Sequence, residues 1–219
     1  MKAKGVLIDL DGTLVDSREA YFEAARAAFA AVGERFQEAE MALEIPKRLE
    51  QYLPLDDLVP GDVQKFLEVY LRTYYRVTPV KTKPMPNVSR ALEMLSGKAK
   101  LALITMRYVP KNAVIEELKN FGLAKYFQHV TTALDTQNPK PSPEALIASA
   151  RYMRVLPCEC AVVGDSVVDI RSGKAAGART VAVLSGIFSL EELEREKPDL
   201  ILENLAQLPS FIDLLWNRL

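Results

Sequence analysis

Short apolar runs rich in Val, Ile and Leu alternate along most of this chain with segments in which apolar residues recur at helical spacing. A short continuous apolar run is typical of a strand that is buried on both faces, as in a parallel sheet. Repeated strand–helix units favour an α/β fold with a doubly wound, Rossmann-like sheet, in which sites form at the carboxyl ends of the strands. The runs predict strands over residues 4–10, 100–105, 128–132, 160–164, 179–183 and 199–202.

Residues that favour helix ends lie between these strands. Asn87 is expected to cap one helix, and Pro110 to open another that ends near Phe121. Ser142 and Pro143 form the pairing of an N-cap with a first helical position, because a serine oxygen accepts from unpaired amides and proline fits the first turn.

The stretch from residue 17 to residue 82 interrupts the alternation, because it contains no strand signal. It holds two apolar stripes at helical spacing, namely Phe22, Ala25, Phe29 and Val32, ended by Gly33, and then Val63, Phe66, Leu67, Tyr70, Leu71 and Tyr74. Three prolines are then expected to mark an extended return: Pro79, Pro84 and Pro86. We therefore expect an α/β core of residues 1–16 and 83–219, with a small all-α domain of residues 17–82 inserted after the first strand.

The charge balance excludes several classes of partner. The 219 residues include 28 Lys and Arg against 29 Asp and Glu, a formal net charge of -1. Proteins that bind nucleic acid usually carry a basic patch, and anionic membranes attract polybasic segments. Because the sequence has neither feature, we expect neither nucleic acid nor a membrane as partner.

The first residues of the chain and its two cysteines indicate the cellular compartment in which the protein is expected. The apolar run of residues 6–10 is broken by Asp9, whereas a signal peptide needs about 7–15 apolar residues in succession. No stretch reaches the ~20 apolar residues of a membrane span. Cys158 and Cys160 are one residue apart, too close for a disulfide and too few for a structural zinc site. We expect free thiols in a reducing, cytoplasmic compartment.

Acidic residues follow two of the predicted strands. Asp9 and Asp11 leave the first strand on the same side, about 7 Å apart, and Gly12 then allows a sharp turn. Asp165 ends the fourth predicted strand, with Asp169 four residues later. A single Asp at such a place is commonly a turn or helix cap. Two clusters at the same edge of a parallel sheet instead predict an oxygen-rich site of the kind that Mg²⁺ prefers.

Two further strand ends carry groups that can bind phosphate. Thr105 places a hydroxyl at the end of the second strand, followed by the backbone N–H groups of Met106 and Arg107. Lys140 lies in a proline-flanked loop before a helix and offers a point charge to a phosphoryl oxygen. Taken alone, these are an ordinary strand-end hydroxyl and a solvated lysine, but their order relative to the acidic clusters favours a phosphate site.

With these motifs, the sequence resembles the haloacid dehalogenase superfamily, specifically its phosphoglycolate phosphatase-like branch with a helical cap. The first motif of that family is matched by Asp9-Leu10-Asp11-Gly12-Thr13-Leu14-Val15-Asp16-Ser17. The second motif falls at Thr105, the third at Lys140, and the fourth at Gly164-Asp165-Ser166 with Asp169. The inserted segment lies where these phosphatases carry a mobile cap.

The resemblance implies a Mg²⁺-dependent phosphatase that hydrolyses a small phosphate monoester through an aspartyl-phosphate. Asp9 would be the nucleophile and Asp11 the general acid/base. Asp9, the backbone carbonyl of Asp11 and Asp165 would hold Mg²⁺, with Asp169 supporting the metal. Thr105, Met106 and Lys140 would hold the phosphoryl group. The implied partner is a small phosphorylated metabolite, such as phosphoglycolate or a sugar phosphate, and the sequence indicates no oligomeric state.

Two departures from the family pattern leave the substrate open. Met106 and Arg107 stand where phosphoglycolate phosphatases often have Asn, and residues 43–49 lack a glycine-rich specificity loop. A phosphomutase would use the same nucleophile, and a phospho-accepting signalling domain would use Asp, Thr and Lys on a similar sheet. The second motif-one aspartate, Asp11, favours a phosphatase over a dehalogenase. Steady phosphate release would separate the hydrolase from these alternatives.

The inserted segment could close over the strand edge about hinges near residues 14–17 and 79–86, excluding water from the site. Candidate specificity residues are Arg18, Tyr21, Lys47, Arg48 and Arg107. The alternative for each cap residue is an ordinary solvated face. His129 is the only histidine, and we expect it to be structural or exposed because it lies away from the motifs.

Overall fold

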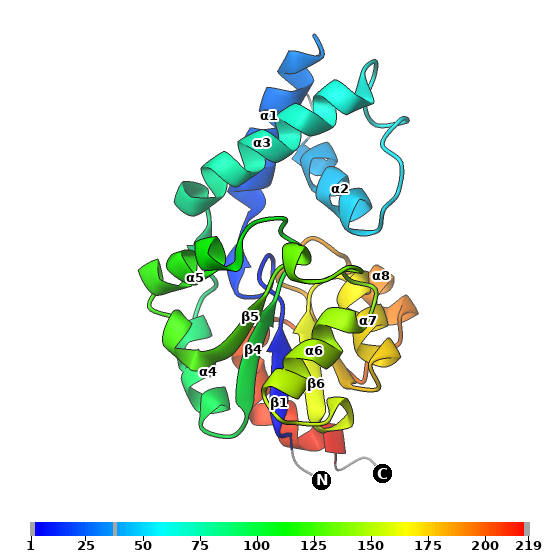
Figure 1. The fold of residues 1–219 in the computed structure, drawn as a ribbon. Coiled ribbons are helices and arrows are strands. Elements are labelled where there is room, and N and C mark those ends of the chain that lie inside the picture. Colours follow the sequence, from blue (N-terminus) through cyan, green and yellow to red (C-terminus); the bar gives the residue numbers. More distant parts are fainter. Residues whose placement is uncertain (1–2, 37–38, 217–219) are drawn as a thin grey trace. The chain divides into compact units, whose positions relative to one another are not determined.

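The computed structural model describes residues 3–36 and 39–216. The chain divides into two compact units, which are described separately (Figure 1). One unit combines Met1–Val15 with Pro84–Leu219, and the other is Asp16–Lys83.

A six-stranded sheet forms the centre of the first unit, in the order β5-β4-β1-β6-β7-β8 (Figure 1). Its strands are β1 (Gly5–Ile8), β4 (Lys100–Ile104), β5 (Phe127–Thr131), β6 (Cys160–Gly164), β7 (Arg179–Val183) and β8 (Leu200–Leu202). Every neighbouring pair is parallel. The predicted α/β class and all predicted strands are confirmed, because a continuous apolar run is what burial on both faces requires.

Helices cover both faces of this sheet. They are α4 (Val88–Ser96), α5 (Lys111–Asn120), α6 (Glu144–Tyr152), α7 (Val167–Ala175), α8 (Leu190–Arg195) and α9 (Leu208–Phe211). Short 3₁₀ turns are η1 (Ala124–Tyr126), η2 (Ala133–Asp135), η3 (Pro157–Glu159), η4 (Leu205–Gln207) and η5 (Ile212–Trp216). Val6 and Ile8 of β1 pack in the cluster that contains α4 and α5, whereas Leu7 packs in the cluster that contains α6. Because side chains alternate along β1, this strand contributes residues to two hydrophobic cores, one on each face of the sheet.

Two predicted helix starts differ in detail from the structure. Asn87 precedes α4 in a left-handed conformation, with φ 61°, and its side chain makes no capping hydrogen bond. Pro143 occupies the N-cap position of α6, one residue later than predicted. Ser142 Oγ still accepts a hydrogen bond from the Glu144 amide at 3.3 Å. Pro110 and Phe121 flank α5 as predicted.

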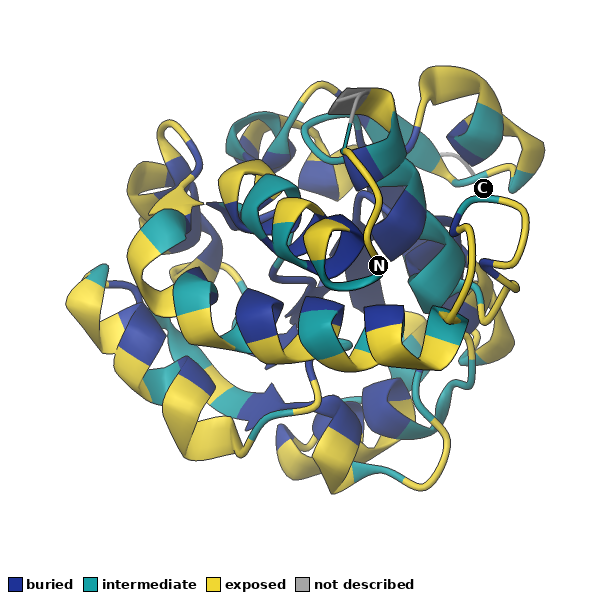
Figure 2. Cartoon of the chain, turned by 90° about the horizontal axis from the view of Figure 1, so that it is seen from above, coloured by how far each residue is buried: buried dark blue, intermediate teal, exposed yellow. Residues whose placement is uncertain are grey.

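The second unit contains α1 (Arg18–Ala31), α2 (Ala39–Glu50) and α3 (Val63–Lys81). Aromatic contacts join α1 to α3: Tyr21 stacks on Tyr74 at 5.4 Å between ring centroids, and Phe29 meets Phe66 edge-on at 4.9 Å. Phe29, Phe66 and Tyr74 belong to the two predicted apolar stripes, whereas Tyr21 directly precedes the first of them. The strand pair β2 (Val15–Asp16) and β3 (Lys83–Pro84) lies where the chain passes between the units. Helices in both units carry buried residues on one side and exposed residues on the other (Figure 2).

Pro79 does not begin an extended return, as the sequence pattern predicted, but lies inside α3. A proline within a helix removes one backbone donor. Two threonine hydroxyls bond to nearby carbonyls: Thr78 Oγ1 donates to Tyr74 O at 2.6 Å, and Thr82 Oγ1 donates to Thr78 O at 2.8 Å. The helix continues past Pro79 to Lys81.

Cys158 is exposed and Cys160 is buried, and both are free thiols as expected. Over residues 3–36 and 39–216, no helix has the length and apolar character that crossing a bilayer demands.

Candidate active site

Three neighbouring strands of the sheet deliver the polar residues predicted from the sequence. Asp9 directly follows β1, Thr105 follows β4, and Asp165 follows β6, and these strands are adjacent in the order β4-β1-β6. Because all three strands run parallel, their carboxyl ends lie at the same edge of the sheet. The three side chains are buried, with exposed fractions of 8%, 3% and 3%.

Asp9, Asp165 and Asp169 form a carboxylate cluster. Each contributes one oxygen, and these oxygens all lie within 4.8 Å of one another. Buried like charges at such separations are unfavourable unless a cation compensates them. A set of hard oxygen ligands without His or Cys suits Mg²⁺. The residues present therefore fit a magnesium ion.

Lys140 supplies one positive charge to this cluster. Its Nζ donates to Asp9 Oδ1 and to Asp169 Oδ1, each at 2.6 Å, and to the carbonyl of Ile104 at 3.2 Å. Burial opposes protonation of this amine, but the Asp169 and Asp9 carboxylates outweigh that penalty and raise the pKa of Lys140 above its ordinary value. Lys140 is consequently a fixed cation at neutral pH.

The loop before α6 holds Lys140 in place. The Glu144 carboxylate accepts hydrogen bonds from the backbone amides of Gln137 and Asn138 and from the Asn138 side chain. Bonds from the Thr136 hydroxyl, the Asn138 side chain and the Gln137 amide lower the pKa of Glu144 to about 2. The Glu144 carboxylate, in the first turn of α6, thus fixes the segment that precedes Lys140.

Asp165 is held by groups from two other strand ends. Thr13 Oγ1 donates to Asp165 Oδ1, and the Ile187 amide donates to Asp165 Oδ2, both at 3.2 Å. A Cβ atom at Gly186 would lie 1.7 Å from Asp165 Oδ2, and one at Gly12 would lie 2.4 Å from the same atom. Only glycine fits at these two positions.

The loop between β7 and α8 is a part of the site that the sequence interpretation missed. Besides Gly186 and Ile187, it contributes Ser185, whose Oγ donates to the carbonyl of Gly12 at 2.7 Å. The available signal was the Ser185-Gly186 pair, which follows the fifth predicted strand after one residue, at the same edge of the sheet.

Asp169 lies in the first turn of α7. Its Oδ2 accepts from the Ser166 amide at 3.3 Å, and its Oδ1 accepts from Lys140. A capping box of this kind fixes the carboxylate relative to the helix start. Asp169 is therefore anchored on both of its oxygens.

Asp11 is bound differently from the other carboxylates. Arg107 Nε donates to Asp11 Oδ2 at 2.8 Å, and Arg107 Nη2 donates to Asp11 Oδ1 at 2.6 Å. Arg107 Nη1 also donates to Glu117 Oε2 at 2.5 Å. The Arg107 amide donates to Thr105 Oγ1 at 3.2 Å, whereas from the sequence we expected this amide to be available to a phosphoryl group.

Comparisons with known proteins agree with this arrangement. The model of haloacid dehalogenase-like hydrolases matches residues 6–183. The phosphoglycolate phosphatase of Escherichia coli K12 is 31% identical over 230 residues, which cover 94% of this chain and 90% of that protein. Pyrophosphatase PpaX of Bacillus pumilus is 27% identical over 214 residues, which cover 94% and 95%.

The chain belongs to the haloacid dehalogenase-like hydrolases. It is an enzyme of the phosphatase branch of this family. A family hydrolase of Streptococcus pneumoniae has the same fold, with a TM-score of 0.81 at 18% identity over 95% of this chain and 98% of that chain. A candidate beta-phosphoglucomutase of Thermotoga maritima has a TM-score of 0.70 at 24% identity, covering 99% and 100%.

In this hydrolase three candidate specificity residues of the inserted unit, Arg18, Tyr21 and Arg48, contact other residues of that unit. Arg18 Nε donates to Asp16 Oδ1 at 2.9 Å, beside a second bond to the same carboxylate. Arg48 bonds to Glu44, to Asp57 and to the carbonyl of Pro54. Tyr21 is buried against Tyr74, and Lys47 is half-buried on α2.

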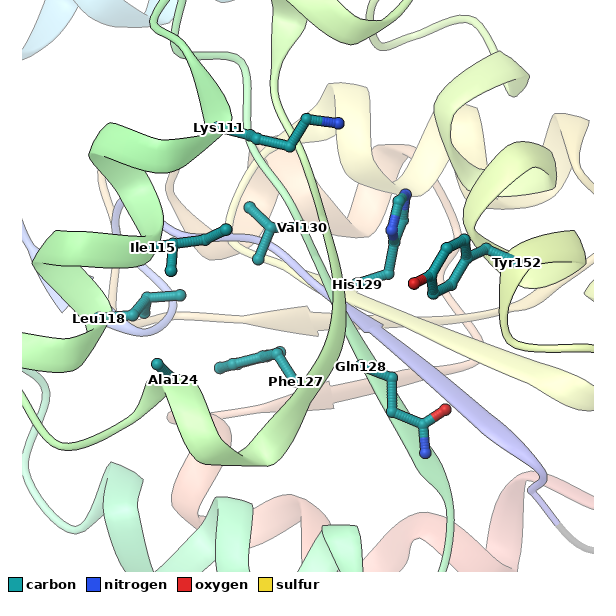
Figure 3. A pocket seen from close by; sticks show the side chains of 9 residues that line it. All are labelled: Lys111, Ile115, Leu118, Ala124, Phe127, Gln128, His129, Val130 and Tyr152. Atoms are coloured by element: carbon teal, nitrogen blue, oxygen red, sulfur yellow. The ribbon is translucent and has the colours of Figure 1, made fainter.

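His129 of the hydrolase lies on the edge strand β5 and lines a hollow of about 330 Å³ (Figure 3). Its ring stacks on Tyr152 with 4.2 Å between centroids. Burial, together with the charge of Lys111, lowers the pKa of His129 below its usual value, although Asp135 opposes this shift. None of the carboxylates of the cluster lines this hollow, which fits the expected structural role.

Proposed function

We propose that this hydrolase is a Mg²⁺-dependent phosphatase that acts on a small phosphate monoester through an aspartyl-phosphate on Asp9. The observation that carries the proposal is the cluster of Asp9, Asp165 and Asp169 around the Lys140 ammonium. A carboxylate nucleophile can attack a phosphate dianion only where positive charge neutralises the phosphoryl oxygens.

The residues of the chain divide the work as follows. Asp9 Oδ attacks phosphorus in line with the ester oxygen, and the bond from phosphorus to that oxygen breaks. Asp11 gives its proton to the departing alkoxide. Asp11 then takes a proton from water, whose oxygen attacks phosphorus and breaks the bond to Asp9. Lys140 and the Thr105 hydroxyl hold the phosphoryl oxygens throughout.

Asp9, Asp165 and the backbone carbonyl of Asp11 would hold the metal, and Asp169 would support the metal site. Bound Mg²⁺ supplies neutralisation of the phosphoryl charge and orientation of the transferring group. Thr13 and the Ile187 amide keep Asp165 in place for this purpose.

We propose a small phosphorylated metabolite as substrate, of the phosphoglycolate or sugar phosphate type. The relative that is 31% identical is a phosphoglycolate phosphatase, and another relative is a pyrophosphatase. A panel of phosphate esters that also includes pyrophosphate separates these classes. The free thiols Cys158 and Cys160 support a reducing, cytoplasmic compartment.

A phosphomutase is the second candidate, because the Thermotoga maritima neighbour is described as one and the same nucleophile would serve. A mutase returns the phosphoryl group to a sugar hydroxyl, whereas a phosphatase releases it to water. Release of inorganic phosphate in amounts far above the enzyme concentration supports the phosphatase, and isomerisation of a sugar phosphate without release supports the mutase.

Substitution of the two motif-one aspartates tests the proposed mechanism. We expect Asp9→Asn to lose turnover by a factor of at least about 10⁴ while the protein stays folded, because the attacking oxygen is gone. Asp11→Asn should slow turnover by about 10²–10⁴ and accumulate phosphoenzyme. Mass spectrometry should then locate the phosphoryl group on Asp9.

Chelation of divalent cations should stop turnover of the wild-type enzyme, and Mg²⁺ should restore it. Phosphate on a serine or histidine, or full turnover after exhaustive chelation, would contradict the proposal.

A further inference from the structure

Arg107 joins the buried carboxylate of Glu117 to the partly buried carboxylate of Asp11, which come from different parts of the core unit. Its guanidinium donates hydrogen bonds to both carboxylate oxygens of Asp11 and to one of Glu117, with N–O distances between 2.5 and 2.8 Å. The side chains of Arg107, Asp11 and Glu117 are 5%, 11% and 8% exposed. The three residues form a carboxylate–guanidinium–carboxylate triad.

The backbone of Arg107 is also fixed. Its amide donates to Thr105 Oγ1 at 3.2 Å, and its carbonyl accepts from the Ala133 amide at 3.1 Å. Both main-chain groups are therefore engaged just beyond the end of β4. The guanidinium projects from a rigid support, which is what placing a second side chain accurately requires.

Glu117 supports Arg107 from α5. It lies on the buried side of that helix, whereas its neighbour Glu116 is exposed and pairs with Lys119 at 2.7 Å. A planar guanidinium bound by two carboxylates is held in one orientation, because its donors form a rigid fork.

A buried ion triad is weak evidence for stability, since apolar residues of similar volume often stabilise a protein as well or better. The triad does, however, fix the carboxylate that the proposed mechanism uses twice. Lys140 is instead engaged with Asp9, Asp169 and the Ile104 carbonyl.

We propose that Arg107 and Glu117 are positioning residues that hold the Asp11 carboxylate where it exchanges protons with the leaving group and with water. This inference rests on the proposed phosphatase function. In the first step the proton passes from Asp11 to the ester oxygen as its bond to phosphorus breaks. In the second step it passes from water to Asp11, as the water oxygen bonds to phosphorus and Asp9 is released.

The two steps differ in their need for Asp11 when the ester is p-nitrophenyl phosphate. Its leaving group departs as a stable anion and needs no proton, so the first step is insensitive to the position of Asp11. The second step still needs the base. A displaced Asp11 should therefore slow hydrolysis of the phosphoenzyme and leave its formation nearly unchanged.

Three single variants test the inference: Arg107→Lys, Glu117→Gln and, as a matched control, Glu116→Gln. Lysine keeps the charge of Arg107 but lacks the fork that grips both Asp11 oxygens. We expect Arg107→Lys to lower kcat for p-nitrophenyl phosphate by about tenfold or more and to lower KM in the same proportion, so that kcat/KM stays nearly unchanged, because only the step after release of p-nitrophenolate is slowed. Rapid mixing should show a burst of p-nitrophenolate equal to the enzyme concentration, with phosphate on Asp9.

Glu117→Gln alone should give the same kinetic pattern with a smaller change. The double variant should differ little from Arg107→Lys alone, because Glu117 acts through Arg107. Glu116→Gln should behave as the wild type. If Arg107→Lys does not fold, Glu117→Gln alone carries the test.

Each other result overturns the inference. A raised KM with unchanged kcat would make Arg107 a substrate-binding residue. Unchanged kinetics would make the triad purely structural, and a raised kcat would mean that it restrains Asp11 from acting. Failure of the proposed function is distinct, because the wild-type enzyme itself would then release no phosphate.

Discussion

At the scale of single residues, the surroundings of Asp165 leave no room for a side chain at Gly186. The Cβ atom of any other residue there would overlap the carboxylate, at 1.7 Å from Oδ2 and 2.1 Å from Cγ. One of the two groups must move, and Asp165 is the one that the proposed metal needs.

We expect Gly186→Ala to displace Asp165 and to raise the Mg²⁺ concentration required for half-maximal activity by about 10–100-fold, as loss of a ligand's support typically does. Gly97→Ala is the matched control, because a Cβ there meets nothing closer than 3.6 Å. Activity titrated with Mg²⁺ measures the effect. An unchanged Mg²⁺ requirement would contradict the placement of the metal beside Asp165.

The sequence predicted the site residues that directly follow strands, such as Asp9, Thr105 and Asp165, because parallel strands deliver their ends to one edge. Thr13, Gly186 and Glu117 were not predicted. Their roles depend on which side chains meet after the β7–α8 loop and α5 have packed, and no local pattern encodes such meetings. The pairing of Arg107 with Asp11 was missed for the same reason, since 96 residues separate them.

At the scale of elements, the edge strand β5 carries the one histidine. His129 is partly buried and lies near Lys111, and both lower its pKa. As the pH falls, His129 in the folded protein therefore stays neutral at pH values where an exposed histidine begins to protonate. Below about pH 6.5 the unfolded chain therefore binds more protons than the folded one, and stability falls as the pH falls.

We expect His129→Gln to remove this part of the pH dependence. At pH 7.5 the variant should be less stable by about 0.5–1.5 kcal/mol, because the stack on Tyr152 is lost. The stability difference between wild type and variant should then shrink as the pH is lowered through 6.5. Urea denaturation at a series of pH values measures this difference, and a constant difference would contradict the assignment.

Other elements show where sequence patterns reach their limit. The apolar stripes predicted α1 and α3, but no stripe was identified for α2 (Ala39–Glu50), which also contains Pro46. Pro79 likewise lies within α3 although proline usually ends a helix. In both helices tertiary packing outweighs a local preference, which a pattern of single residues cannot reveal.

At the scale of the whole molecule, the three carboxylates of the proposed metal site all belong to one of the two units. Asp9, Asp165 and Asp169 lie in the unit of Met1–Val15 and Pro84–Leu219. A ligand that binds only the folded form stabilises that form by RT ln(1 + [L]/Kd), which is about 2.7 kcal/mol at a hundredfold excess over Kd. The stabilisation reaches only those segments that unfold together with the binding site.

Hydrogen exchange with and without Mg²⁺ measures how far that stabilisation extends. We expect saturating Mg²⁺ to slow exchange of the most protected amides of β1 and β6 by up to about a hundredfold, because their exposure requires loss of the site. Amides of α1 and α3 should change little, since the unit of Asp16–Lys83 supplies none of the three carboxylates. Asp165→Asn is the control, and its core strands should not respond to Mg²⁺. Equal protection of α1 and α3 would mean that the two units open as one, because the metal would then stabilise residues that contribute nothing to its binding. Absence of protection in β1 and β6 would instead remove the metal from this edge of the sheet.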